Sequence, residues 1–274
     1  MSYASILVHV TTGKAGAPQL ALARAMAERF DATLIGVGAE MVPPLVPDSG
    51  YYSFQGDWFT IMRGDIENNL KAARAAFDTA SVGLAKPTLW EAGIQYPTGA
   101  VARASRAADL IIADARGATS DVYRQVDPAE LAITSGRPVL VAPRRGEPLE
   151  ARRVVLAWKD TREARRALSD AMPFFEKAES VLVVEVCEEG EAEDSKIRTA
   201  DVAEALGRHG VKAEAKVAVH KHPGGHEILR QASVFGADLV VAGAYGHSRV
   251  GEWVFGGVTR DLLVQDDIHI LLSH

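Results

Sequence analysis

The chain has 274 residues, of which 47% are hydrophobic and 24% charged, and its formal net charge at pH 7 is −6. This length and composition are typical of a globular protein with room for two domains of ordinary size. Acidic and basic residues are interspersed, so the sequence lacks the basic face that duplex nucleic acid requires, and we expect no nucleic-acid partner.

Strands and helices are predicted to alternate along the first half. Short apolar runs between turn residues indicate buried strands, and apolar residues at helical spacing indicate amphipathic helices. The predicted strands are 6–10, 33–37, 88–91, 109–113 and 139–142, and the predicted helices are 19–30, 65–80, 99–107 and 128–134. This alternation predicts a parallel sheet covered by helices.

One segment of the first half interrupts the alternation. Residues 41–59 combine prolines, glycines and aromatic side chains. The segment is too apolar for a disordered linker and too irregular for a helix or strand, so we predict a packed loop or lid.

After a linker at 144–153 the alternation begins again. The second set of strands is predicted at 154–158, 180–186, 212–219, 238–242 and 268–272, with helices at 162–172, 197–208, 226–235 and 258–264. Asp160 is the predicted N-cap of the first of these helices, with Glu163 three positions later.

The two halves are copies of one unit. The run ADLIIADARG from Ala108 matches ADLVVAGAYG from Ala237 without gaps, and the register continues to the last predicted strand of each half. The surplus length of the first half falls close to residues 41–59. The sequence therefore predicts an α/β protein with two tandem domains, 1–146 and 151–274. Each is expected to be a five-stranded, Rossmann-like parallel sheet with helices on both faces.

A glycine-rich loop follows the fourth strand of the second half. The apolar run 239–242 ends at Gly243, Gly246 follows, and the pair Gly256 and Gly257 precedes a predicted helix. Glycines let backbone N–H groups approach an anion closely, and a helix N-terminus adds partial positive charge. The pattern predicts a phosphate site and hence a nucleotide.

This loop fits the signature G-x2-G-x9-G-[ST], with Gly243, Gly246 and Gly256 at the three glycine positions. Together with VVLAWKDTREARRAL from Val154 and with Pro223, it makes the chain resemble the tandem type of the universal stress protein family. The resemblance implies domains of the adenine nucleotide α-hydrolase type, paired through their last strands as an internal pseudo-dimer. It leaves a homodimer open, and it implies a role in regulating the stress response.

The resemblance also implies a ligand, which is ATP or a related adenine nucleotide, with Mg²⁺ as its companion. In members that bind ATP, loop glycines and a hydroxyl residue hold the phosphates. An acidic residue after the first strand and an apolar residue on the second frame the nucleoside. The residues transferred to this site are Gly243, Gly246, His247, Ser248, Arg249, Gly256, Gly257, Val258, Thr259, Ala157, Lys159 and Val186.

The sequence departs from the family pattern at several of these positions. Gly257 replaces the usual Ser or Thr, and Lys159 stands where an acidic residue is usual. In the first half, Asp114 and Asp127 replace two of the glycines, and Thr11 replaces the acidic residue. Carboxylates repel phosphates. We therefore expect the first domain to serve as a structural partner that binds no nucleotide in this way.

Three other interpretations of the sequence compete with the nucleotide site. His220, His222 and His226 match no standard zinc spacing, so a polar loop is favoured and no metal site is expected. If the glycine-rich loop is only a structural turn that binds no ligand, the chain is an interaction or scaffold protein. Residues 41–59 would then form its binding surface for an unknown protein partner. A slow nucleotide hydrolase is less favoured, because nothing fixes a general base near the loop.

The expected compartment is the cytoplasm. Cys187 is the only cysteine, so the chain can form no internal disulfide, which suits a reducing environment. The first residues lack the features of a signal peptide, and no segment reaches the length of a membrane span. We expect neither a membrane partner nor a dedicated enzymatic turnover.

Overall fold

The computed structural model describes residues 2–12, 16–44, 55–115, 121–145, 148–220, 224–245 and 257–274, with side chains in the third range from Trp58 onward. The chain divides into two compact units, Tyr3–Asp127 and Pro128–His274. Each unit is described by itself. No helix in the ranges given above is both long and apolar enough to cross a membrane.

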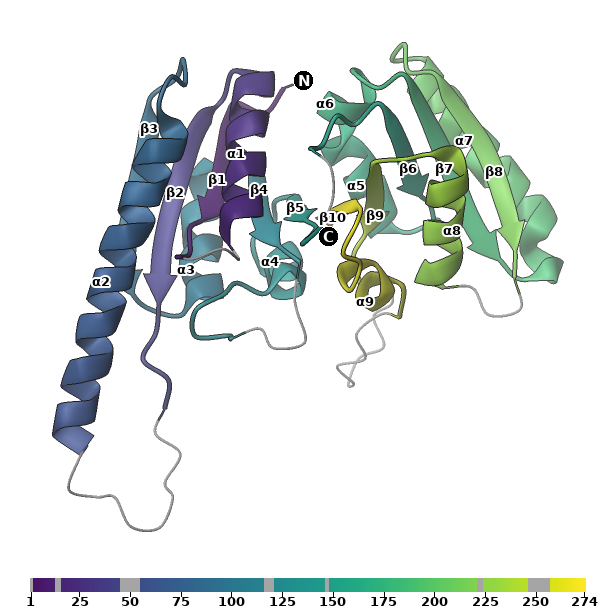
Figure 1. The fold of residues 1–274 in the computed structure, drawn as a ribbon. Coiled ribbons are helices and arrows are strands. Elements are labelled where there is room, and N and C mark those ends of the chain that lie inside the picture. Colours follow the sequence, from purple (N-terminus) through teal and green to yellow (C-terminus); the bar gives the residue numbers. More distant parts are fainter. Residues whose placement is uncertain are drawn as a thin grey trace. The chain divides into compact units, whose positions relative to one another are not determined.

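The unit Tyr3–Asp127 is a parallel sheet in the order β3-β2-β1-β4. Helices α1 and α2 cover one face of this sheet, and α3 covers the other (Figure 1). The elements are β1 (Ser5–His9), α1 (Ala17–Phe30), β2 (Thr33–Glu40), α2 (Gln55–Ser81), β3 (Thr88–Ile94), α3 (Pro97–Ala104), the 3₁₀ turn η3 (Ser105–Ala107) and β4 (Leu110–Asp114).

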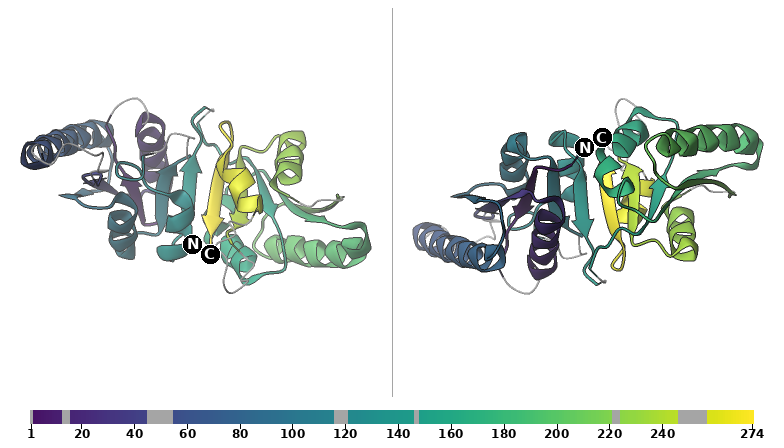
Figure 2. Two further views of the ribbon diagram at one scale, coloured as in Figure 1. Left: turned by 90° about the horizontal axis from the view of Figure 1, so that it is seen from below. Right: turned by 90° about the horizontal axis from the view of Figure 1, so that it is seen from above.

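In the unit Pro128–His274 the strands follow the order β5-β10-β9-β6-β7-β8. All are parallel except β5, which runs antiparallel to β10. Helices lie on both faces of the sheet (Figure 2). The elements are α4 (Pro128–Thr134), β5 (Val139–Ala142), β6 (Arg153–Ala157), α5 (Arg162–Asp170), α6 (Met172–Phe175), β7 (Ser180–Cys187), η4 (Glu189–Glu191), α7 (Ala192–Gly207), β8 (Ala213–Val219), α8 (Gly225–Phe235), β9 (Leu239–Gly243), α9 (Gly257–Leu263) and β10 (His269–Ser273).

The central strands are largely apolar because helices cover both faces of each sheet, whereas the edge strands β3 and β8 are mostly exposed and carry charged residues. Residues 110–113 and 239–242, which are the matching runs of the two halves, are all at most 2% exposed. Packing is also close between the sheet and α2. A Cβ atom built on Gly36 of β2 would lie 2.7 Å from the rings of Phe77 and Trp90, so this position of β2 must be glycine.

The predicted alternation of strands and helices is confirmed, and so is the doubly wound α/β fold. The last strands of the two sequence halves, β5 and β10, pair antiparallel, with Leu271 opposite Leu140. For this reason α4 and β5 belong to the compact unit that begins at Pro128. The predicted domain boundary at 146 marks where the sequence repeat ends, whereas the division at Pro128 marks where the chain separates into compact units. The boundary at 146 therefore remains a prediction.

The loop predicted at 41–59 is wrong at its end, because α2 begins at Gln55 and includes the last residues of that segment. The buried stripe that identifies a helix from its sequence begins only at Ile66 and continues with Ala73 and Phe77. Before it, Phe59 and Ile61 are 54% and 63% exposed, so these first turns carry no such stripe. Residues 45–54 of the predicted loop lie outside the described part.

The N-cap of α5 was also predicted wrongly. Thr161, not Asp160, is the extended residue before the helix, and its hydroxyl accepts a hydrogen bond from the backbone N–H of Ala164 at 3.3 Å. Asp160 lies one position too early to cap and forms an ion pair with Arg165 instead.

Candidate functional site

Each sheet contains a topological switch point, which is where ligands bind in doubly wound folds. In the unit Pro128–His274, β6 lies between β9 and β7, so the chain crosses from β6 toward one side and later returns to the other. In the unit Tyr3–Asp127, β1 lies between β4 and β2 in the same way. The carboxyl ends of β6 and β9, and of β1 and β4, are therefore the two candidate sites.

The first candidate site is built by the ends of β6 and β9 and by the start of α9. Ala157 ends β6 and is paired with Ala242, directly before Gly243 at the end of β9. Helix α9 begins at Gly257 and lies at the edge toward which the strands point (Figure 1). Three segments that supply predicted site residues therefore begin or end at one edge of the sheet. Gly246, His247, Ser248, Arg249 and Gly256 lie outside the described residues.

Gly243 has a structural role of its own. A Cβ atom built there would lie 2.6 Å from the backbone N of Ala164 and 2.6 Å from the carbonyl carbon of Glu163. The start of α5 therefore lies directly against β9, and only glycine permits this approach. Gly257 differs, because a Cβ atom there would meet no atom of the described residues within 4 Å. Packing thus accounts for the first glycine of the motif but places no such demand on Gly257.

The other predicted residues of this site differ in exposure. Thr259 is buried within α9, at 3% exposure, and so it does not replace the hydroxyl that Gly257 lacks at the surface. Lys159 is exposed directly after β6, whereas Val186 on β7 and Val258 on α9 are partly exposed. The exposed lysine places a positive charge at this edge of the sheet, at the position where the family pattern has an acidic residue.

Sequence reasoning missed two titratable residues beside Gly243. Glu163 lies in the first turn of α5, with a side chain only 12% exposed. Its burial favours protonation, but hydrogen bonds from its own backbone N–H and from Thr161, and the charges of Arg162 and His274, outweigh this and lower its pKa. The ring Nδ1 of His274 lies 2.9 Å from the carbonyl oxygen of Ala244. The capping pattern marked Glu163 as a first-turn residue but not as a neighbour of Gly243, and the contact of His274 has no sequence signal because it joins residues 30 positions apart.

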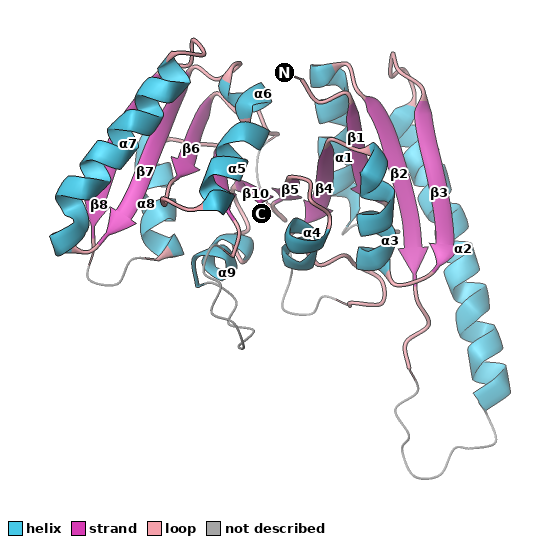
Figure 3. Cartoon of the chain, turned by 180° about the vertical axis from the view of Figure 1, so that it is seen from behind, coloured by secondary structure: helices cyan, strands magenta, loops and turns pink. Residues whose placement is uncertain are grey.

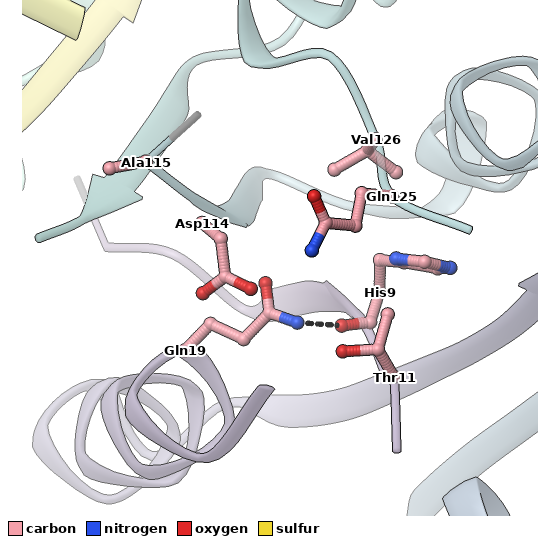
Figure 4. A pocket seen from close by; sticks show the side chains of 7 residues that line it. All are labelled: His9, Thr11, Gln19, Asp114, Ala115, Gln125 and Val126. Carbon is pink, nitrogen blue, oxygen red and sulfur yellow. Dashed lines mark hydrogen bonds between the residues drawn. The ribbon is translucent and has the colours of Figure 1, made fainter. Parts of the chain in front are cut away.

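The second candidate site is a small pocket in the unit Tyr3–Asp127. Its volume is about 10 Å³, and its lining comes from the ends of β1 and β4, from α1 and from the segment before α4. The lining residues are His9, Thr11, Gln19, Asp114, Ala115, Gln125 and Val126 (Figure 4). In the repeat, Asp114 stands at the position of Gly243 and Thr11 at that of Lys159.

Burial shifts the pKa of both titratable groups in this pocket. It raises the pKa of the Asp114 carboxyl to about 7. It lowers the pKa of His9 to about 4, although a hydrogen bond to the carbonyl oxygen of Ala39 opposes the shift. His9 is therefore neutral at pH 7. Asp127 does not line the pocket, and its backbone N–H donates to the hydroxyl of Thr98 at 3.0 Å.

A larger cavity of about 170 Å³ lies beyond the end of β2. Its polar wall is Glu40, which is 5% exposed and accepts hydrogen bonds from Asn69 at 3.0 Å and from Arg124 at 3.4 Å. Met62 and Ile66 of α2 add an apolar wall. The carboxylate of Glu40 is thus already paired with partners of its own unit.

The histidines that were weighed as metal ligands do not form a cluster in the described structure. His220 follows β8, His226 belongs to α8, and His222 lies outside the described residues. The nearest carboxylate to His226 is Asp261, at 3.9 Å from its Nε2. Within the ranges that the structure covers, no three His, Cys, Asp or Glu side chains come together to hold a metal ion.

Comparison with protein-family models and with curated protein sequences finds no match. Solved structures, in contrast, share the fold over nearly the whole chain. A universal stress protein from Archaeoglobus fulgidus matches with a TM-score of 0.71 at 15% identity, covering 98% of this chain and 95% of its own. A functionally unknown protein from Pseudomonas aeruginosa matches with a TM-score of 0.61 at 14% identity, covering 99% and 92%.

A candidate universal stress protein from Pseudomonas aeruginosa matches with a TM-score of 0.60 at 16% identity, covering 99% of this chain and 93% of its own. The chain is thus an α/β protein with two tandem copies of a doubly wound unit. Its fold is that of the two-domain universal stress proteins, as the sequence resemblance predicted.

Proposed function

We propose that the chain is a cytoplasmic member of the universal stress protein family that binds ATP or a related adenine nucleotide and acts as a regulator. The observation that carries this proposal is a coincidence of two independent features. The glycine motif of the second half begins at Gly243, and Gly243 ends the strand beside the switch point of its sheet. Ligands of doubly wound sheets bind at that position.

The proposed site divides into a phosphate end and a nucleoside end. The phosphates would meet Gly243, Gly246, His247, Ser248, Arg249, Gly256 and Gly257, with Val258 and Thr259 behind them. Backbone N–H groups at glycines and at the start of a helix suit this role. Ala157, Lys159 and Val186 would frame the nucleoside, and Mg²⁺ would accompany the phosphates in solution.

Calorimetry of the full chain with ATP, with and without Mg²⁺, tests the proposal. We expect saturable binding that Gly246→Val abolishes, because a side chain at the second glycine obstructs the approach of phosphate to the backbone. Gly190→Val is the matched control, since Gly190 lies in η4 with nothing within 4 Å of a built Cβ atom. Absence of binding at millimolar ATP would contradict the proposal.

A second candidate function is that of an interaction protein without a nucleotide. The exposed side chains of Phe59 and Ile61 on the first turns of α2 favour it, because large apolar residues at a surface often belong to binding sites. A wild-type chain that shows no heat with ATP, and that binds a protein through these residues but not after Phe59→Ser and Ile61→Ser, would establish this alternative.

A further inference from the structure

The pocket at the ends of β1 and β4 contains oxygen atoms without a hydrogen-bond partner. The Oε1 atom of Gln19 and the Oγ1 atom of Thr11 are both buried, and no donor within the described structure reaches them. Gln19 is only 1% exposed. Buried polar atoms in native proteins are normally satisfied, so an unsatisfied pair that lines one pocket indicates a group that completes it.

The orientation of Gln19 is fixed by its other amide atom. Nε2 of Gln19 donates a hydrogen bond of 2.8 Å to the backbone oxygen of His9, which leaves Oε1 facing the carboxyl group of Asp114 (Figure 4). With the two amide atoms exchanged, Oε1 would face the backbone oxygen of His9, which can never donate, whereas the Asp114 carboxyl can donate to Oε1 when it is protonated. The pocket therefore presents acceptors, namely the Gln19 oxygen, the Asp114 carboxyl and the Thr11 hydroxyl.

None of the lining residues that the structure describes neutralises the carboxylate. The ring of His9 is neutral at pH 7 and points away from Asp114 toward the carbonyl oxygen of Ala39, 3.0 Å from its Nε2. The other lining side chains on β1, α1, β4 and the segment before α4 are uncharged. An ionised buried carboxylate without a cation is costly, so ionisation of Asp114 calls for a positive charge in the pocket.

We infer that this pocket is a binding site for one small monovalent cation of about the size of a water molecule, such as ammonium or potassium. A volume of about 10 Å³ holds a single particle of water size. One carboxylate balances one positive charge. A calcium or magnesium ion would leave one positive charge unbalanced, because Asp114 is the one carboxylate among the described lining residues.

Protonation of Asp114 competes with the cation. The carboxyl group has a pKa near neutrality, so the proton and the cation exchange in the physiological range. His9, the other titratable group of the lining, has a pKa of about 4 and stays neutral throughout that exchange. Binding of the cation releases one proton, and it must therefore lower the pH at which Asp114 titrates.

Carbon-13 NMR of aspartate carboxyl groups in the full chain tests this directly. The titration midpoint of Asp114 is measured in potassium, ammonium, sodium and tetramethylammonium chloride at equal ionic strength. We expect the midpoint near pH 7 in tetramethylammonium, which is too large to enter. Potassium or ammonium should lower it by about one pH unit at ten times the dissociation constant. The same midpoint in all four salts, or a shift in sodium alone, would overturn the inference, since the pocket would then hold water or a smaller ion.

Thermal unfolding provides a second readout. At about pH 8, potassium or ammonium should raise the melting temperature relative to tetramethylammonium, and at about pH 5 this difference should vanish. Asp114→Asn should abolish the difference, whereas the matched control Asp31→Asn, at a surface residue paired with Lys86, should retain it. A difference that survives Asp114→Asn would contradict the site. If that variant does not fold, the NMR titration of the wild type decides alone.

Discussion

Asp109 and Asp238 each accept hydrogen bonds from two consecutive backbone N–H groups, at the start of β1 and shortly before β6 respectively. The Oδ2 atom of Asp109 accepts hydrogen bonds from the backbone N–H groups of Ala4 at 2.8 Å and Ser5 at 3.0 Å. The Oδ2 atom of Asp238 accepts from Glu150 at 3.1 Å and Ala151 at 2.6 Å. Both aspartates begin the matching apolar runs, so the repeat preserves a hydrogen-bonding device as well as a pattern.

Replacing either aspartate by alanine should destabilise its unit. Two backbone donors then lose a charged acceptor, which costs about 1–3 kcal/mol in the free energy of unfolding. Urea denaturation of Asp109→Ala and Asp238→Ala measures this loss. Asp78→Ala, which removes an exposed carboxylate paired with Arg74, should change stability by less than about 1 kcal/mol. Equal losses in the free energy of unfolding for all three substitutions would show that these hydrogen bonds stabilise the fold no more than an exposed ion pair does.

Stability should depend on pH through His269 of β10. Burial lowers its pKa to about 4, against the opposing influence of Asp238. Between about pH 6.5 and 4, His269 therefore binds a proton in the unfolded chain but not in the folded chain. Its contribution to stability is full above about pH 6.5 and is lost as the pH falls. The expected slope is up to about 1.4 kcal/mol per pH unit.

Denaturation at several pH values, compared between the wild type and His269→Gln, isolates this contribution. The comparison is needed because Asp114, whose pKa is raised, acts in the opposite direction in the same window. His209→Gln, at an exposed histidine, should leave the pH slope as it is in the wild type. An unchanged slope in His269→Gln would mean that this histidine titrates normally in the fold.

Gly243→Ala and Gly257→Ala should differ sharply in stability. The added methyl group at Gly243 would lie 2.6 Å from backbone atoms of α5, and relieving that overlap should cost about 1–3 kcal/mol. The methyl group at Gly257 meets no atom within 4 Å in the part of the chain that the structure describes, and alanine also favours a helix more than glycine. Thermal or urea unfolding of the two variants measures this difference. Equal stabilities of the two variants would contradict the prediction.

Gly257→Ser should strengthen nucleotide binding, if the proposed site holds ATP. The substitution supplies the hydroxyl of the family motif at a position where a built Cβ atom meets no described residue within 4 Å. One added hydrogen bond of about 0.5–1.5 kcal/mol corresponds to a gain of about two- to tenfold in affinity. Calorimetry with ATP measures this gain, and Gly257→Ala controls for the change in backbone flexibility. Equal affinities of the serine and alanine variants would exclude a contact from the hydroxyl.

The sequence was informative where burial is continuous or periodic. The strands at 110–113 and 239–242 are apolar throughout because helices cover both faces, and their matching letters predicted the repeat as well. The start of α2 was missed because its first turns are not covered by the rest of the unit. Figure 3 shows these turns extending past the ends of β2 and β3.

The candidate sites were predictable only in part. Gly243 follows from the motif, but its contact with α5 is visible only in three dimensions. Gln19 reads as an ordinary polar residue in the first turn of α1, and nothing nearby in the sequence marks it as buried. Its burial depends on the backbone of His9, and the pocket also needs Asp114 from a distant strand. Such sites arise from long-range contacts that leave no periodic signal.

The antiparallel pairing of β5 with β10 has a consequence for how the chain could be divided. β5 is the last strand of the first sequence half, yet its hydrogen-bonding partner is the last strand of the second. Arg144, directly after β5, also forms two 2.8 Å hydrogen bonds with Asp266. The peptide link after Arg144 is therefore not what keeps β5 in place. A protein cut there, or produced as two fragments, would retain the means to reassemble.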